Sequence, residues 1–138
     1  MEDANVAIVR RVVDVFNSGD LAVFDELIAA DYVNHDAPPG AVQGREGRKQ
    51  VVAMFRGAFP DLRSTVLDVV ADRDKVVVRA NMQGTQNGTF MGRPPSGRAV
   101  SVTAIDIYRI SDGQIAERWG VMDMLALMRQ IDTDHGPG

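Results

Sequence analysis

Asp123 stands where a carboxylate could do acid/base chemistry. It follows the β-prone stretch 114–122 and directly precedes the apolar run 124–128. Side chains on a strand alternate between two faces, so Trp119, Val121 and Asp123 would share one of them. If that face is buried, the charged form of the carboxylate is disfavoured, which suits proton transfer near neutral pH. The alternative is an ordinary helix cap, and one residue can take both roles.

Two neighbouring residues are candidates for the same chemistry. His35 is the sole histidine in the body of the chain, since His135 lies in the tail, and imidazole exchanges protons near neutral pH. Asn34 can both donate and accept hydrogen bonds, which would hold a carbonyl or enolate oxygen. If the segment is extended, only one of the two faces a pocket. We prefer His35, because its ring can also carry charge.

Asp106 is the third candidate for catalysis. It lies in the middle of a predicted strand with an apolar residue on each side. It shares a face with Tyr108, and both faces of this strand look largely covered. We expect one face to line a pocket and the other to meet a partner chain. Asp106 would then be a second acid, or the salt-bridge partner of Arg79 or Arg109.

Large apolar side chains are candidates for the wall of such a pocket. Most belong to the core by residue type alone, but a subset could surround a small hydrophobic ligand. The wall residues that we single out are Trp119, Phe16, Phe55, Phe59 and Phe90.

The composition describes one globular domain and excludes several kinds of site. The net charge of the 138 residues is −4, which gives no electrostatic footprint for nucleic acid, although basic residues cluster at 45–49. With no cysteine and two histidines, a metal site built on several His or Cys ligands is excluded. No apolar run could span a bilayer and the amino terminus is polar, so we expect no membrane partner and a cytoplasmic location.

Helices are expected early in the chain and strands after them. Apolar residues recur at helical spacing over 5–16, 21–29 and 46–59. Residues 32–35 favour a short strand or extended arm before a Pro-rich turn. Period-two patterns predict hairpin-linked strands at 64–71, 75–85, 100–110 and 114–122, and a last helix follows over 124–131. This order indicates an α+β fold with helices packed on one face of a curved sheet.

Several phrases of the sequence resemble one family. They are Phe16-Asn-Ser-Gly-Asp20, Tyr32-Val-Asn-His35, Gly84-Thr-Gln-Asn-Gly88, Gly92-Arg-Pro-Pro-Ser-Gly-Arg98, Ile105-Asp-Ile-Tyr-Arg109, and Asp112 to Trp119 with Asp123. Together they resemble the SnoaL-like polyketide cyclases, or ester cyclases, of the nuclear transport factor 2 (NTF2-like) fold. The resemblance implies a cone, in which three N-terminal helices pack on the concave face of a curved mixed or antiparallel sheet around a pocket. Residues 1–132 would form one domain and 133–138 a flexible tail.

The resemblance also implies a chemistry. The family's cyclases close a ring by intramolecular aldol condensation of a polyketide ester, with no cofactor and no metal. By resemblance, Asp123 takes the place of their acid/base aspartate, and Asn34 or His35 that of a polar pocket residue. Asp106 stands where the cyclases carry a helper histidine, and Gln86 where many relatives carry another. These departures leave open an isomerase or hydrolase of the same fold, or a ligand-binding or association module without catalysis.

A second copy of the chain is the expected protein partner. The strands at 75–85 and 100–110 look apolar on both faces, which suggests that one face is covered by another subunit. We therefore expect a homodimer or tetramer. The expected ligand is a small hydrophobic compound that contains a carbonyl group.

Overall fold

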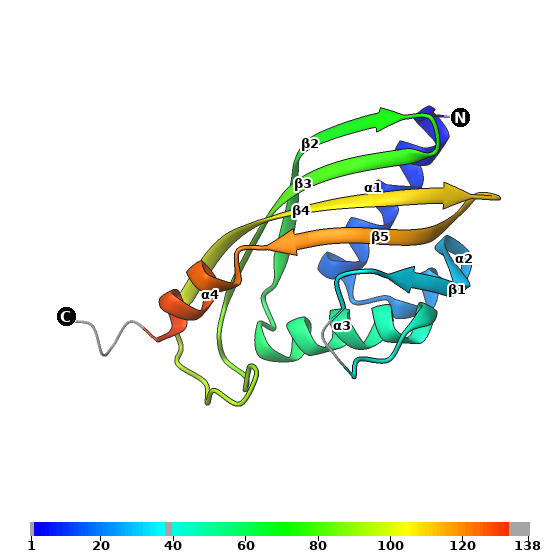
Figure 1. The fold of residues 1–138 in the computed structure, drawn as a ribbon. Coiled ribbons are helices and arrows are strands. Elements are labelled where there is room, and N and C mark those ends of the chain that lie inside the picture. The colour runs from blue at the N-terminus through cyan, green and yellow to red at the C-terminus, as the bar shows by residue number, and fades with distance from the viewer. Residues whose placement is uncertain (1, 38–39, 133–138) are drawn as a thin grey trace.

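A five-stranded mixed sheet curves around the N-terminal helices in the computed structural model, which describes residues 2–37 and 40–132 (Figure 1). The elements are α1 (Glu2–Ser18), the 3-10 helix η1 (Leu21–Val23), α2 (Phe24–Leu27), β1 (Ile28–Asn34), α3 (Gly44–Ala58), β2 (Arg63–Asp72), β3 (Lys75–Thr85), β4 (Ala99–Ser111), β5 (Gln114–Met122) and α4 (Met124–Ile131). The strand order is β1-β5-β4-β3-β2, and only the β1–β5 pair is parallel. The predicted α+β class is confirmed. The tail predicted at 133–138 lies outside the described residues.

The hairpin between β4 and β5 sets which residues face one another across the sheet. Its turn residues Asp112 and Gly113 both have positive φ, 52° and 76°, as a two-residue type I′ turn requires. After this turn the register shifts once, between Arg109 and Ile110, and then places Tyr108 opposite Arg118 and Asp106 opposite Gly120. All four of these residues therefore lie on the same face of the sheet.

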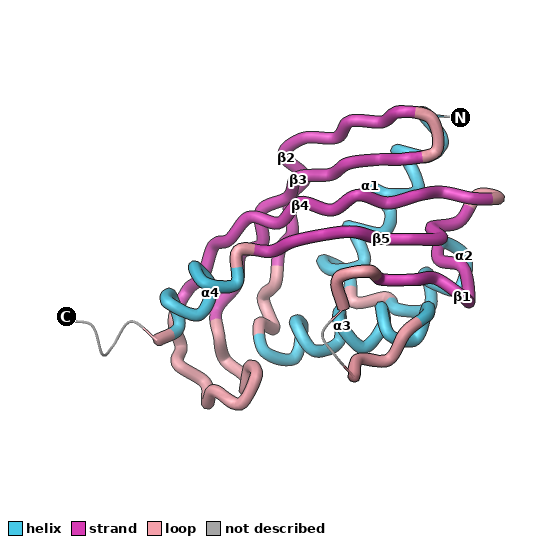
Figure 2. Tube along the Cα trace, viewed as in Figure 1, coloured by secondary structure: helices cyan, strands magenta, loops and turns pink. Residues whose placement is uncertain are grey.

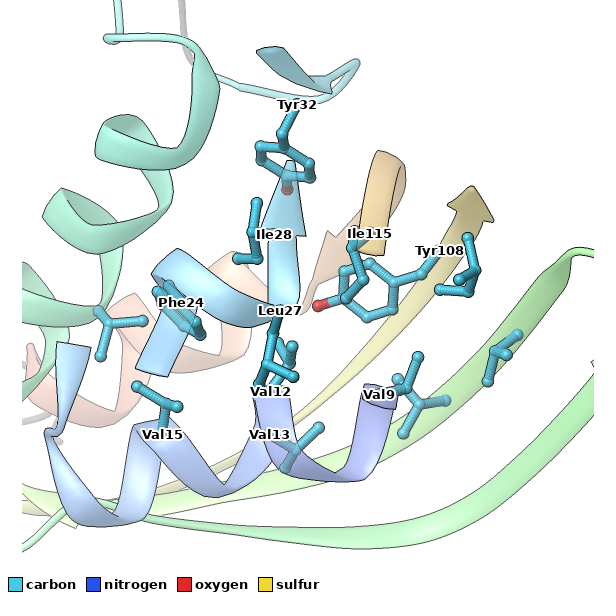
Figure 3. Packing of buried hydrophobic residues seen from close by; sticks show 14 residues of the cluster. Val9, Val12, Val13, Val15, Phe24, Leu27, Ile28, Tyr32, Tyr108 and Ile115 are labelled. Atoms are coloured by element: carbon cyan, nitrogen blue, oxygen red, sulfur yellow. The ribbon is translucent and has the colours of Figure 1, made fainter. Parts of the chain in front are cut away.

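The main core lies between the concave face of the sheet and the helices α1 and α2 (Figure 3). Valines at helical spacing on α1 point toward the sheet because they form one stripe of the helix. Buried side chains of this cluster include Val9, Val12, Val13, Phe24, Leu27, Ile28, Tyr108 and Ile115. Full burial of each such aliphatic or aromatic side chain contributes about 1.5–3 kcal/mol, and this packing fixes α1 across the sheet.

A second apolar cluster closes the other end of the cone. The loop at 86–98 lies beside the C-terminal end of α3 and beneath α4 (Figure 2). The backbone N–H groups of Asn87 and Gly88 donate to the carbonyl of Ala58, at 3.1 and 3.0 Å. The buried members of the cluster include Phe55, Phe59, Phe90, Leu127 and Ile131. The Gly- and Pro-rich loop is thus fixed to the helices by hydrogen bonds and burial.

The helix expected over 21–29 is wrong after Leu27. Ile28 has φ −120° and ψ 131°, an extended conformation, and the chain continues as β1. Pairing with β5 satisfies the backbone groups of this segment and buries Ile28 and Tyr32. The arm predicted at 32–35 is therefore the end of a longer strand. No helix in the described part of the chain is long and apolar enough to cross a membrane.

The second cluster yields a stability prediction within α4. Leu127 is fully buried, whereas Leu125 on the same helix is 64% exposed. Leu127→Ala should lower the free energy of unfolding by about 2–5 kcal/mol through lost burial and a cavity. Leu125→Ala should change it by about 0.5 kcal/mol or less. Urea denaturation measures both, and equal effects of the two variants would contradict this packing of α4.

Candidate active site

A cavity of about 340 Å³ opens between the concave face of the sheet and the helices α1 and α3. Most of its wall is apolar, and phenylalanines and methionines make up much of it: Phe16, Phe55, Phe90, Met54, Met82, Met91, Met122 and Met124. The polar residues of the lining are Asn34, Asp36, Arg48, Ser64, Asp106, Tyr108 and Arg118. An apolar cavity with a few polar groups is the usual form of a small-molecule site.

An ion pair between Asp106 and Arg118 forms one part of the polar lining. Arg118 Nε and Nη2 donate to Asp106 Oδ1 at 2.7 and 2.5 Å, and the two side chains are only 13% and 14% exposed for Arg118 and Asp106. Arg118 Nη1 also donates to Asn34 Oδ1 at 3.0 Å. Both bonds to the carboxylate reach Oδ1, so Asp106 Oδ2 has no protein donor among the described residues.

The ion-pair partners expected for Asp106 are wrong. Arg79 pairs with Asp68, and Arg109 pairs with Glu117. On β4, Arg109 is three residues from Asp106, and Arg79 on β3 lies opposite Ile105, the neighbour of Asp106. Because side chains alternate between the two faces, both arginines lie on the outer face of the sheet. Arg118 shares the inner face, which is why it meets Asp106 instead.

Gly120 makes room for this ion pair. A Cβ atom at this position would lie 2.1 Å from Asp106 Oδ1 and 2.5 Å from Arg118 Nη2. Any side chain there would displace one or both groups. The backbone N–H of Gly120 donates to Asp36 Oδ2 at 2.8 Å, which fastens the segment after β1 to β5.

Arg48 and Tyr108 form the other part of the polar lining. Arg48 Nη2 donates to the Tyr108 hydroxyl at 2.9 Å, and its guanidinium lies 5.2 Å from the centre of the Phe16 ring. Arg48 Nε and the Tyr32 hydroxyl are buried without a hydrogen-bond partner. Burial raises the pKa of Tyr108, so its hydroxyl keeps its proton at neutral pH.

Arg48 keeps its charge in this setting. Burial acts against the guanidinium charge, but the nearby Asp106 carboxylate and the hydrogen bond to the Tyr108 hydroxyl hold the pKa of Arg48 above its ordinary value. The cavity therefore contains a permanent positive charge on its helical side.

Asn34 and His35 point to opposite sides, as the alternation of an extended segment requires. Asn34 lines the cavity, whereas His35 does not, so the preference for His35 was wrong. The His35 ring stacks on Trp119 at 4.7 Å and 8° on the outer side of the sheet, and His35 Nε2 lies 2.7 Å from Glu117 Oε2. The hydrogen bond from His35, assisted by Arg109, lowers the pKa of Glu117.

Asp123 lies outside the cavity and caps α4. Its Oδ1 accepts a hydrogen bond from the backbone N–H of Ala126 at 3.0 Å, and the residue is exposed. It continues the face of Trp119 and Val121, but that face is the outer one, where Val121 is 67% exposed. The buried face on which the acid/base interpretation depended is therefore not the face of Asp123, and the structure has the capping alternative. A role of Asp123 in proton transfer stays a prediction.

The residues predicted to form an apolar wall divide into two groups, and their contact with a substrate stays a prediction. Phe16, Phe55 and Phe90 line the cavity, but Trp119 and Phe59 do not. Trp119 lies on the outer face of β5, and Phe59 is fully buried in the second apolar cluster. Gln86 is fully buried, and its Nε2 donates to the carbonyls of Gly88, Arg93 and Pro94 within the 86–98 loop.

The sequence analysis did not single out several residues of the cavity lining: Asp36, Arg48, Ser64, Tyr108, Arg118 and Gly120. One signal was present for Arg48, which stands four residues before Val52 and seven before Phe55 on the apolar stripe of α3. Arg118, Gly120 and Met122 stand at every second position of β5, so alternation places them on one face of the strand. The sequence could group these three residues, but it could not say that their face is the inner one. Among residues 2–37 and 40–132, no group of three His, Cys, Asp or Glu side chains is arranged to hold a metal ion.

Comparison with known proteins identifies the family of the chain that forms this cavity. Residues 6–131 match the SnoaL-like polyketide cyclases. The chain belongs to this family. Over 134 residues it is 28% identical to the aklanonic acid methyl ester cyclase DnrD of Streptomyces peucetius, covering 91% of this chain and 89% of that protein. Similarity to curated ester cyclases over this length supports an enzyme of the cyclase type.

Solved structures agree on the fold of this SnoaL-like chain. TsrD from Streptomyces laurentii superposes with a TM-score of 0.89 at 32% identity, covering 96% of this chain and 97% of that one. IdmH from Streptomyces antibioticus superposes with a TM-score of 0.81 at 37% identity, covering 92% and 97%. The NTF2-like cone is therefore confirmed.

The space left by Gly120 can be tested directly. Gly120→Ala should displace the Asp106–Arg118 pair and lower the free energy of unfolding by about 1–3 kcal/mol, as overpacking does. Gly57→Ala is the matched control, because no heavy atom lies within 4 Å of a Cβ added there, and alanine at a compatible site stabilises by about 0.4–1 kcal/mol. Chemical denaturation compares the two, and a Gly120→Ala protein as stable as the wild type would contradict the close contact.

Proposed function

We propose that this SnoaL-like protein closes a ring of a polyketide-like carbonyl compound by a cofactor-free intramolecular aldol reaction in the cavity. The curated relatives that support this proposal are named as methyl ester cyclases, and they align along about nine-tenths of the chain. The apolar lining suits the body of such a substrate, and the polar groups suit its carbonyl oxygens.

The observation that carries the proposal is the Asp106 carboxylate inside the cavity. It is oriented by Arg118 through one oxygen, while the other oxygen has no protein donor among the described residues. An oriented carboxylate with a free lone pair can act as a general base if the substrate proton lies within hydrogen-bonding distance. Asp123, by contrast, uses its side chain to cap α4.

The proposed reaction moves one proton and forms one carbon–carbon bond. Asp106 takes a proton from a carbon between two carbonyl groups, and the resulting enolate attacks a second carbonyl of the same molecule. The new alkoxide then recovers the proton from Asp106, so substrate and product have the same composition. Arg118 and Asn34 stand beside Asp106, and their N–H groups would stabilise negative charge on oxygen.

Two isosteric variants test which carboxylate transfers the proton. Asp106→Asn should lower kcat by about 100-fold or more, because an amide cannot accept the proton. Asp123→Asn should retain nearly full activity, because asparagine also caps helices. Conversion of aklanonic acid methyl ester and, in parallel, of the corresponding free acid, followed by chromatography of the isomeric products, measures both.

Two outcomes would oppose this assignment. Full activity of Asp106→Asn would remove Asp106 from the mechanism. Loss of activity in a folded Asp123→Asn protein would return proton transfer to Asp123. Circular dichroism of each variant separates loss of function from loss of fold.

We also propose that two copies associate through the outer face of the sheet. Ile105 on β4 lies opposite Val121 on β5, and these side chains are 42% and 67% exposed. Leu67 and Val70 extend the exposed apolar surface along β2. The Arg79–Asp68 ion pair lies beside Ile105 on the same face. Large apolar side chains exposed on one face of a sheet favour a protein interface.

Light scattering after gel filtration tests the homodimer. The wild type should elute with about twice the 15.0 kDa mass of one chain, whereas Val121→Glu should shift it to the monomer, because a charge would be buried in the interface. Val42→Glu, in the exposed loop before α3, is the matched control and should leave the mass unchanged. Because association depends on protein concentration, a wild type that stays monomeric at about 100 µM would contradict the proposal.

A further inference from the structure

Arg48 is a buried cation with too few partners. It stands on α3 with 6% of its surface exposed, and it lines the cavity. A guanidinium has five N–H donors, yet the described residues supply one hydrogen-bond acceptor, the Tyr108 hydroxyl. Nε is buried with no acceptor at all, and no carboxylate forms an ion pair with Arg48 in the described part of the chain. Buried charges are ordinarily paired, so this one calls for a partner from outside the chain.

The charged groups at the polar end of the cavity are unevenly paired. Arg118 binds Asp106, and the second carboxylate of the lining, Asp36, is exposed and accepts from the backbone of Gly120. Neither carboxylate forms an ion pair with Arg48. The buried guanidinium of Arg48 therefore has no ion-pair partner among the described residues.

We propose that Arg48 binds an anionic oxygen of the substrate, namely a free carboxylate, and so selects acids over neutral esters. This inference rests on the proposed function, since the occupant of the cavity is taken to be its substrate. Arginine is suited to the task because its planar fork pairs with a carboxylate through two parallel hydrogen bonds. The Tyr108 hydroxyl accepts from Arg48 and keeps its own proton, so it can donate to the same carboxylate.

The rest of the lining defines the other end of such a ligand. Phe55, Phe90, Met54 and Met91 offer aromatic and thioether surface, which suits a flat, unsaturated body. The substrate class is therefore an aromatic or polyene compound with a carboxylate at one end. An enolate formed during the reaction offers the same oxygen chemistry, so the test uses compounds that cannot form one.

Binding of 2-naphthoic acid and of methyl 2-naphthoate, measured by calorimetry at neutral pH, tests the proposal. Neither compound has an acidic hydrogen beside its carbonyl group, so turnover does not enter the result. The wild type should bind the acid roughly 10- to 100-fold more tightly than the ester, as expected for a charge-assisted hydrogen bond. In Arg48→Gln that preference should fall to about one, with the affinity for the ester unchanged within about twofold.

Three further variants keep the experiment decisive. Arg10→Gln removes an exposed positive charge from α1 and should retain the preference for the acid. Arg48→Lys should retain part of it, and it serves as the test variant if Arg48→Gln does not fold. Asp106→Asn should bind the acid at least as tightly as the wild type. An error in the aldol mechanism would therefore appear in turnover alone, whereas an error in the carboxylate site would appear in the ratio of the two affinities.

Several outcomes would overturn the assignment. They are equal affinity of the wild type for acid and ester, no binding of either compound at millimolar concentration, and an unchanged preference in folded Arg48→Gln. A preference lost in Arg118→Gln but kept in Arg48→Gln would also overturn it. If Arg48 only ties α3 to the sheet, Arg48→Gln would lose stability while keeping the ratio of the two affinities.

Discussion

The register between β4 and β5 is the constraint on which the cavity depends. The two-residue turn at Asp112 and Gly113 starts the pairing, and the shift between Arg109 and Ile110 then sets the register in which Asp106 lies opposite Gly120. A slip by one residue would move Asp106 and its partners to the outer face. The glycine is part of the same constraint, because a Cβ at position 120 would occupy the space of the ion pair. The turn and the register shift together thus control a site several residues away along both strands.

Charge inside the cone is held in two different ways. Asp106 and Arg118 neutralise each other at close range, so neither is left alone in a poorly hydrated space. Among the described residues, Arg48 has only the hydroxyl of Tyr108 and the face of Phe16 as partners. The Asp106–Arg118 pair is satisfied within the protein, whereas the charge of Arg48 is not. A ligand with a negative charge gains more binding free energy at such an unpaired cation than at the protein surface, because little water screens the interaction.

Sequence patterns predicted the strands well and the site less well. The ranges 75–85 and 114–122 agree with β3 and β5 because alternation and hairpin turns are local signals. Alternation also placed Trp119, Val121 and Asp123 on one face, but it does not say which face is inner. That choice depends on where α1 and α3 pack, which is a long-range property. Asp123 and His35 were misplaced for this reason, and Arg48 was passed over as part of a basic cluster.

Trp119 has a consequence for how this protein is observed in solution. It is the sole tryptophan of the chain, it is stacked against His35 with Lys75 Nζ 5.3 Å from its ring centre, and it stands on the side of the sheet away from the cavity. Tryptophan fluorescence of this protein therefore comes from one ring that lies next to an imidazole and an ammonium group. A change in its intensity or colour signals events on the outer surface, such as pairing of two sheets, and stays silent when a ligand enters the cone.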